Sequence, residues 1–167
     1  MIIQLNINQT MKKIFNVKDT TNTTGIALLV ARIVIAALML THGIPKMIML
    51  FSGAPVQFPS IMGLTSELSL GLAVFAEVCC SVLLLVGFGT RLATIPLIIT
   101  MLVAVLLIHG DDPFATKEPA FQYLLVYIVL LFTGSGKFSI DYLLQRGRAT
   151  TNYAAEKVED PTLSIYQ

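Results

Sequence analysis

The strongest constraint on the fold is a set of apolar runs that are long enough to cross a lipid bilayer. One of them, residues 66–88, carries a carboxylate, Glu77, near its middle. About 20 apolar residues in a helix span the hydrocarbon layer, and an unpaired charge at the centre of such a helix is costly. We therefore expect an integral membrane protein in which Glu77 has a partner, a bound ligand or a proton.

The composition agrees with a membrane protein. Of the 167 residues, 55% are hydrophobic and only 13% are charged, against roughly 25% charged residues in a soluble domain. The net charge of +1 leaves no broad basic surface for nucleic acid. Cys79 and Cys80 are neighbours in an apolar run, which excludes a disulfide framework and predicts small packing residues. Tyr123 and Tyr127 share one helical face, where core packing is favoured over stacking on a ligand.

Four spanning helices in one all-α domain account for the apolar runs. We predict an antiparallel four-helix transmembrane bundle, followed by a short interfacial helix that Ser139 caps. Gly43 and Pro45 are expected to interrupt or fray the end of the first helix. The expected spans are residues 25–40 with a possible extension to 49, then 66–88, 92–108 and 119–133. The expected domains are a polar cytoplasmic segment at 1–24, a membrane domain at 25–143 and a disordered tail at 144–167.

The distribution of lysine and arginine predicts the orientation. With four spans, both termini lie on one side of the membrane, and eight basic residues fall on that side against two on the other. The rule that basic residues remain inside then predicts an inner-membrane protein with both termini in the cytoplasm. The eight are Lys12, Lys13, Lys18, Arg91, Lys137, Arg146, Arg148 and Lys157, and the two are Lys46 and Lys117.

An ion pair between Arg32 and Glu77 is the first expectation for the intramembrane charges. Counted from the cytoplasmic face, Arg32 lies about 10 Å deep and Glu77 about 15 Å deep at 1.5 Å per residue. Either charge alone would cost several kcal/mol in the apolar layer, whereas a hydrogen-bonded pair is tolerated. A purely structural clasp and a functional pair are both compatible with this pattern.

A second polar set is expected at the outer face, where the ends of the helices meet. Two histidines with carboxylates could ligate a divalent metal or relay a proton to a bound headgroup, although no metal is assigned to the set. Interfacial side chains that cap helix ends are the alternative reading. The set, which also forms the candidate quinone- or ligand-binding site, is His42, Lys46, His109, Asp112 and Glu118.

In its ordered motifs the chain resembles the DoxX family. The resemblance covers about residues 25–143, with one departure at Cys79 and Cys80, where the family commonly has glycines. It implies a four-span fold and working positions at Arg32, Glu77 and the outer polar set, and some relatives are similar to the membrane subunit of thiosulfate:quinone oxidoreductase. The motifs are Arg32, residues 41–46, 76–77, 87–93, 109–114 with Glu118, and the glycine-rich segment 134–141 that ends in Asp141.

The leading functional hypothesis is a quinone-interacting or accessory membrane subunit in a sulfur or oxidative-stress redox complex. The sequence has no haem, iron–sulfur or dinucleotide signature, so any catalysis requires a bound quinone and a partner redox subunit, with the protein as subunit of a quinone-reducing oxidoreductase. Membrane lipid and a homo-oligomer are the other expected partners. A non-enzymatic scaffold or assembly factor is the alternative, and a small proton-coupled transporter ranks behind it because four spans are few for a carrier.

Overall fold

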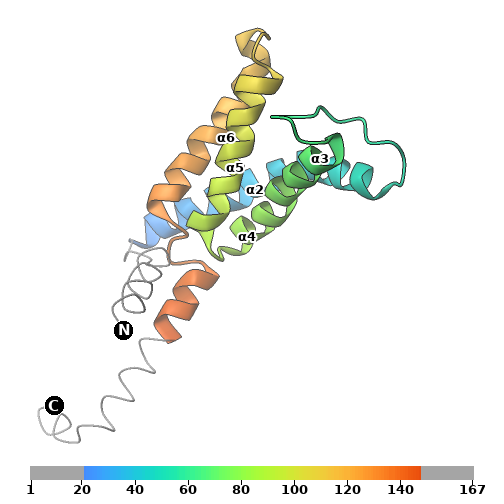
Figure 1. Cartoon of the computed structure of the whole chain (residues 1–167). Coiled ribbons are helices and arrows are strands. Elements are labelled where there is room, and N and C mark those ends of the chain that lie inside the picture. The colour runs from blue at the N-terminus through green and yellow to red at the C-terminus, as the bar shows by residue number, and fades with distance from the viewer. Residues whose placement is uncertain (1–20, 148–167) are drawn as a thin grey trace, which may run out of the picture.

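A computed structural model of the protein describes residues 21–147, and every regular element within that range is a helix (Figure 1). Three stretches are long and apolar enough to cross a membrane. A fourth helix has polar residues in its first half, at Lys117, Glu118 and Gln122, and is less apolar for that reason. The three apolar stretches are α2 (Asn22–Phe51), then α3 (Ser66–Val74) with η1 (Phe75–Cys80) and α4 (Ser81–Val86), then α5 (Thr90–Val103) with η2 (Ala104–Ile108); the fourth helix is α6 (Phe114–Thr133).

The first helix is longer and less interrupted than the sequence predicted. α2 continues for 30 residues through both Gly43 and Pro45, so the expected break at these positions was wrong. Gly43 is buried against η1, where a Cβ would lie 3.0 Å from the Glu77 carbonyl carbon and 2.8 Å from Val78 Cγ2. The glycine therefore permits close contact between two helices, and Pro45 removes only its own amide donor from an otherwise regular helix.

Two wide helical turns interrupt the second and third apolar stretches. The π-helical segments η1 and η2 span six and five residues, and η1 carries Glu77. π-Helical turns are rare and occur frequently at functional sites. Because such turns depend on packing between helices, neither was predicted from the apolar pattern.

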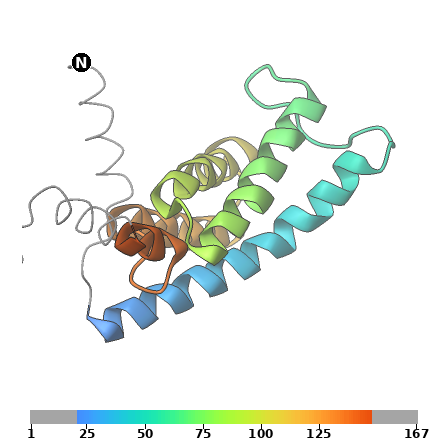
Figure 2. The ribbon, with the colours of Figure 1, turned by 90° about the horizontal axis from the view of Figure 1, so that it is seen from below.

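The helices pack as two pairs around one core. α2 lies against α3, η1 and α4, while α5 packs along α6, and η1 also contacts α5. Figure 1 shows α5 and α6 rising together across the α2 pair, and Figure 2 shows the same pairs from below. Side chains from all four stretches fill the space between the pairs. The buried core consists of Leu28, Ile35, Ala36, Met39, Cys80, Leu84, Ala93, Leu97, Met101, Tyr127 and Leu130.

The outward faces of the helices are apolar. Leu106, Leu125 and Phe132 are each more than 60% exposed, and many other large apolar side chains share this surface. A soluble protein rarely exposes so much contiguous apolar area. Together with the three apolar stretches, this surface identifies a multi-pass membrane protein whose helices contact lipid.

The turn between α4 and α5 and the segment after α6 agree with the sequence prediction. Gly87 and Gly89 adopt left-handed conformations that reverse the chain within three residues. After α6, a short helix occupies residues 140–147, and Ser139 Oγ caps it by accepting the Tyr142 amide at 3.2 Å. Residues 144–147, which were assigned to the disordered tail, are therefore helical, while residues 1–20 and 148–167 lie outside the described range.

Candidate functional site

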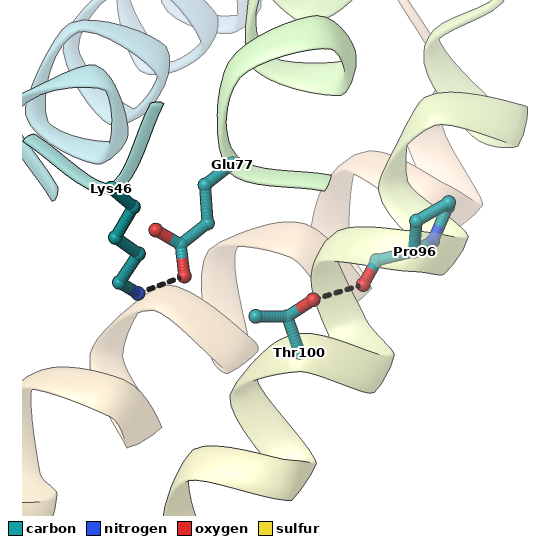
Figure 3. Close-up of polar contacts among 4 residues, drawn as sticks. All are labelled: Lys46, Glu77, Pro96 and Thr100. Carbon is teal, nitrogen blue, oxygen red and sulfur yellow. Dashed lines mark hydrogen bonds and ion pairs between the residues drawn. The ribbon is translucent and has the colours of Figure 1, made fainter. Parts of the chain in front are cut away.

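The intramembrane carboxylate is paired with a lysine near the end of the first helix. Lys46 Nζ on α2 donates to Glu77 Oε1 on η1 at 2.5 Å (Figure 3). The Glu77 side chain is 3% exposed, whereas the Lys46 side chain is 30% exposed. The pair thus links a buried carboxylate to an ammonium group that reaches the surface of the molecule.

The predicted ion pair between Arg32 and Glu77 does not form. Gly43 of α2 lies against Glu77, whereas Arg32 lies against Gly87. The ten residues from 77 to 87 correspond to about 15 Å along a helix, which separates the two charges beyond side-chain reach. Counting residues from each helix end placed the two side chains at similar depths, but the long α2 helix starts lower and brings Lys46, rather than Arg32, level with Glu77.

Arg32 instead holds the segment that follows α6. Its Nη2 donates to the Phe138 carbonyl at 2.6 Å, and the carboxylate of Asp141 acts on it electrostatically. The Asp141 carboxylate in turn accepts hydrogen bonds from the backbone N–H groups of Gly89, at 2.8 Å, and Thr90, at 3.3 Å, where α5 begins. A carboxylate suits the positive end of a helix dipole. This cluster, which we name the arginine clasp (Arg32, Gly87, Phe138 and Asp141), is a structural device that joins three parts of the chain.

Aromatic rings lie near the Lys46–Glu77 pair. The His42 ring meets Tyr123 edge-on at a centroid distance of 5.9 Å, and Tyr123 stacks on Tyr127 at 6.1 Å. From the loop after α2, the Phe58 ring lies 5.9 Å from Lys46 Nζ, within the range of a cation–π interaction. The site therefore combines one ion pair with a wall of planar side chains from α2, α6 and the loop.

Two oxygen atoms near the pair are buried without a hydrogen-bond partner among residues 21–147. They are Glu77 Oε2 and the hydroxyl oxygen of Tyr127. Glu77 acts electrostatically on Tyr127 and on its stacked neighbour Tyr123, so the two atoms share one region of the interior. Buried polar atoms are nearly always hydrogen-bonded. The two unsatisfied oxygens are therefore candidates to bind a polar group next to the ion pair.

The predicted outer set divides into separate groups. His42 and Lys46 lie with Glu77, whereas His109 Nδ1 pairs with Asp112 Oδ2 at 2.7 Å at the far end of η2. Glu118 accepts from Gln122, its neighbour on α6, at 3.1 Å. Between residues 21 and 147 no three His, Cys, Asp or Glu side chains come together in a way that could hold a metal ion. The structure does not show these five side chains as one hydrogen-bonded group, since α5 and α6 extend away from the end of α2 (Figure 1).

The neighbouring cysteines lie on different sides of η1. Cys80 is buried in the core and Cys79 is exposed on the outward face. Successive helical residues point about 100° apart, which explains this separation. Both thiols are free, and Cys80 has the packing role that the sequence predicted.

One contributor to the site and one polar contact within α5 were missed in the sequence. Phe58 lies in a loop rich in glycine and proline, where no periodic signal marks its position. Thr100 on α5 donates its hydroxyl to the Pro96 carbonyl at 2.9 Å (Figure 3). A threonine four residues after a helical proline could have been noticed, since such a hydroxyl often bonds back to that carbonyl.

The arrangement suits proton exchange and the binding of a polar, planar group. Lys46 supplies a partly exposed cation, Glu77 supplies a buried carboxylate with one free oxygen, and His42 lies beside Tyr123. Histidine and glutamate are common proton carriers in proteins. None of these functions requires a metal or a nucleotide.

Comparison with known proteins gives one finding. A model of the DoxX family matches residues 27–110, which is half of the chain and includes Arg32, Lys46 and Glu77. No curated protein and no solved structure matches. The matched region contains most of α2, the helical stretch that carries Glu77, and α5 with η2, and so includes both residues of the Lys46–Glu77 pair. This chain belongs to the DoxX family.

Proposed function

We propose that the protein is a quinone-binding accessory subunit of a redox complex in the inner membrane. In this proposal α6 is a fourth span, since its 20 residues extend about 30 Å at 1.5 Å per residue. Both termini then face the cytoplasm, where eight of the ten lysines and arginines other than Arg32 lie. Lys46 and Glu77 lie toward the outer side of the membrane.

The observation that carries the proposal is the half-satisfied carboxylate beside the lysine and the stacked rings. Glu77 has one oxygen on Lys46 and one without a partner in the described part of the chain. A quinone is a lipophilic planar ring with two oxygens that accept hydrogen bonds and protons. Such a ring fits against Phe58, Tyr123 and His42, and a ligand oxygen would take the position next to the ammonium of Lys46.

Lys46 and Glu77 would then assist proton transfer to the quinone, because its reduction to a hydroquinone takes up two electrons and two protons. A partner redox subunit supplies the electrons, since the chain has no haem or iron–sulfur signature. Lys46 donates a hydrogen bond to a quinone oxygen and stabilises the negative charge that develops there. Glu77 takes up one proton from the outer side through Lys46 and passes it to this oxygen, and the second quinone oxygen takes its proton from water.

Quinone content tests the proposal directly. The full chain is purified in lipid nanodiscs, its lipids are extracted, and bound quinone is measured per protein for the unsubstituted protein and for Glu77→Gln. We expect about one quinone per chain in the unsubstituted protein and at least a tenfold loss in the variant. Lys117→Gln is the control, because Lys117 contacts the Gly110 carbonyl at the tip of the α5–α6 pair, away from Glu77. Quinone at background level in the unsubstituted protein, with no quinone-dependent activity in membranes, refutes the proposal.

A non-enzymatic scaffold is the second candidate, and the arginine clasp favours it. Arg32 joins the first helix to the segment after α6, and the Lys46–Glu77 pair joins α2 to η1. Both contacts hold helices together without any ligand. In this case Glu77→Gln would lower the amount of protein or of assembled complex in the membrane, and every kinetic constant of the complex would stay the same.

A further inference from the structure

Unsatisfied oxygens occur on the helical stretches that carry Glu77 and Tyr127. Three oxygens in the second and fourth helical stretches are buried and have no hydrogen-bond partner within residues 21–147: Glu77 Oε2, Ser81 Oγ and the Tyr127 hydroxyl. Each belongs to a residue that is at most 2% exposed. Leaving such a group unpaired costs free energy that a folded protein ordinarily avoids.

The contacts of the helices place these oxygens at neighbouring levels. Ser81 follows Glu77 by four residues on one continuous helical stretch, and side chains four apart are neighbours along a helix. Tyr127 comes from α6 and lies within the electrostatic range of Glu77. The level of α6 is fixed by Tyr123, which contacts His42, the residue next to the Gly43 that packs on Glu77. The three oxygens therefore belong to similar levels of two helical stretches, and Tyr127 reaches the electrostatic range of Glu77 from α6.

Apolar side chains enclose this group. Met39, Cys80, Leu84 and Met101 belong to the same core as Tyr127 and offer no strong hydrogen-bonding groups. One bound oxygen atom would satisfy the three groups together, and a buried water in a protein commonly has two to four polar partners.

We propose that Glu77, Ser81 and Tyr127 together bind a single hydroxyl oxygen. A hydroxyl can donate its hydrogen to the Glu77 carboxylate and accept one from Tyr127 or Ser81, whereas a carbonyl oxygen can only accept. The site therefore selects a group that carries a hydrogen, which is either a water molecule or the hydroxyl of a reduced carrier. Only the second source rests on the function proposed above, and in that case the site holds the hydroquinone in preference to the quinone.

Thermal unfolding of two matched variants in lipid nanodiscs tests for the bound oxygen. Tyr127→Phe removes one hydroxyl and keeps the ring, and Tyr123→Phe makes the same change on the stacked neighbour. We expect Tyr127→Phe to lower the Tm by about 2–4 °C, because a made hydrogen bond is lost, and Tyr123→Phe to change it by less than about 1 °C. An unchanged or raised Tm for Tyr127→Phe overturns the proposal, since removal of an unpaired buried hydroxyl relieves a cost.

A crystal structure of the unsubstituted full chain in a lipidic mesophase supplies the second measurement. One density peak within hydrogen-bond distance of Glu77 Oε2 and the Tyr127 hydroxyl supports the proposal, and a direct bond between those two atoms with no peak overturns it. The same structure of protein produced in cells that cannot synthesise quinone distinguishes water from the hydroxyl of a reduced carrier. A peak that persists there is water, and a peak that is lost there is the hydroxyl of the carrier. Persistence also shows that the oxygen site stands even if the quinone proposal fails.

Discussion

Arg32 and Gly87 are in such close contact that no side chain fits between them. A Cβ built on Gly87 would overlap Arg32 Nη1, and it would also lie 2.7 Å from Ser139 Cβ. The backbone of Gly87 is left-handed, with a φ of 70°. This contact lets the buried guanidinium pass beneath the turn between α4 and α5 and reach the Phe138 carbonyl.

Gly87→Ala should therefore destabilise the protein through two additive effects. The left-handed conformation costs about 1–2 kcal/mol for a residue with a Cβ, and the overlap with Arg32 adds about 1–3 kcal/mol. Gly53→Ala is the matched control, because Gly53 has the same φ of 70° and open space around it. Thermal unfolding in nanodiscs should show the larger loss at Gly87, and equal losses at the two positions would contradict the close contact.

Replacement of two helical glycines by alanine should change the stability of the protein in opposite directions. Gly43→Ala places a methyl group against Val78 and Glu77 and should destabilise the protein by about 1–3 kcal/mol. Gly71→Ala meets no atom within 4 Å and should stabilise the protein by about 0.5–1 kcal/mol, since alanine loses less backbone entropy in a helix. Chemical denaturation in mild detergent measures both, and a stabilising Gly43→Ala would show that α2 and η1 are not in contact there.

Removal of the ammonium partner should expose the cost of a buried carboxylate. Lys46→Met leaves Glu77 without its ion pair and should lower stability by about 3–5 kcal/mol. The double variant Lys46→Met with Glu77→Gln removes both charges and should be more stable than the single variant. Lys117→Met, which loses only an exposed contact with Gly110, should stay within about 0.5 kcal/mol of the unsubstituted protein. Additive losses in the double variant would argue against a direct pair.

Asp141 should contribute strongly to the stability of the protein, although it lies after the last long helix. Asp141→Ala removes two acceptors from the start of α5 and the nearby charge that compensates Arg32. Loss of a helix cap costs about 0.5–2 kcal/mol, and the uncompensated arginine adds to it. Asp111→Ala, at an exposed position, is the control. Equal Tm values for the two variants would show that Asp141 does not stabilise the α5 start.

Those parts of the structure that depend on local sequence could be predicted. Apolar runs placed the long helices, the glycines at 87 and 89 placed a tight turn, and Ser139 capped the short helix that follows. Gly43 shows the limit of this reasoning, because a glycine that breaks a helix and one that allows a close contact look the same in a sequence.

The partners of the intramembrane charges could not be predicted by counting residues. Depth estimates assumed that helices begin at one plane, whereas α2 begins at Asn22 and continues for 30 residues. As a result Arg32 was assigned to Glu77, although Asp141 and Phe138 surround it. The π-helical turn at Glu77 depends on contacts between helices, and no spacing of residue types in the sequence predicts it.

The arginine clasp imposes an order on how the chain is built. The carbonyl that Arg32 binds lies 106 residues later in the sequence. While the ribosome makes the protein, the first helix must therefore enter the membrane with an uncompensated guanidinium and wait for almost the whole membrane domain to follow. Final assembly is completed only when the segment at residues 134–141 emerges, so a chain truncated before it would leave a charge stranded in the bilayer.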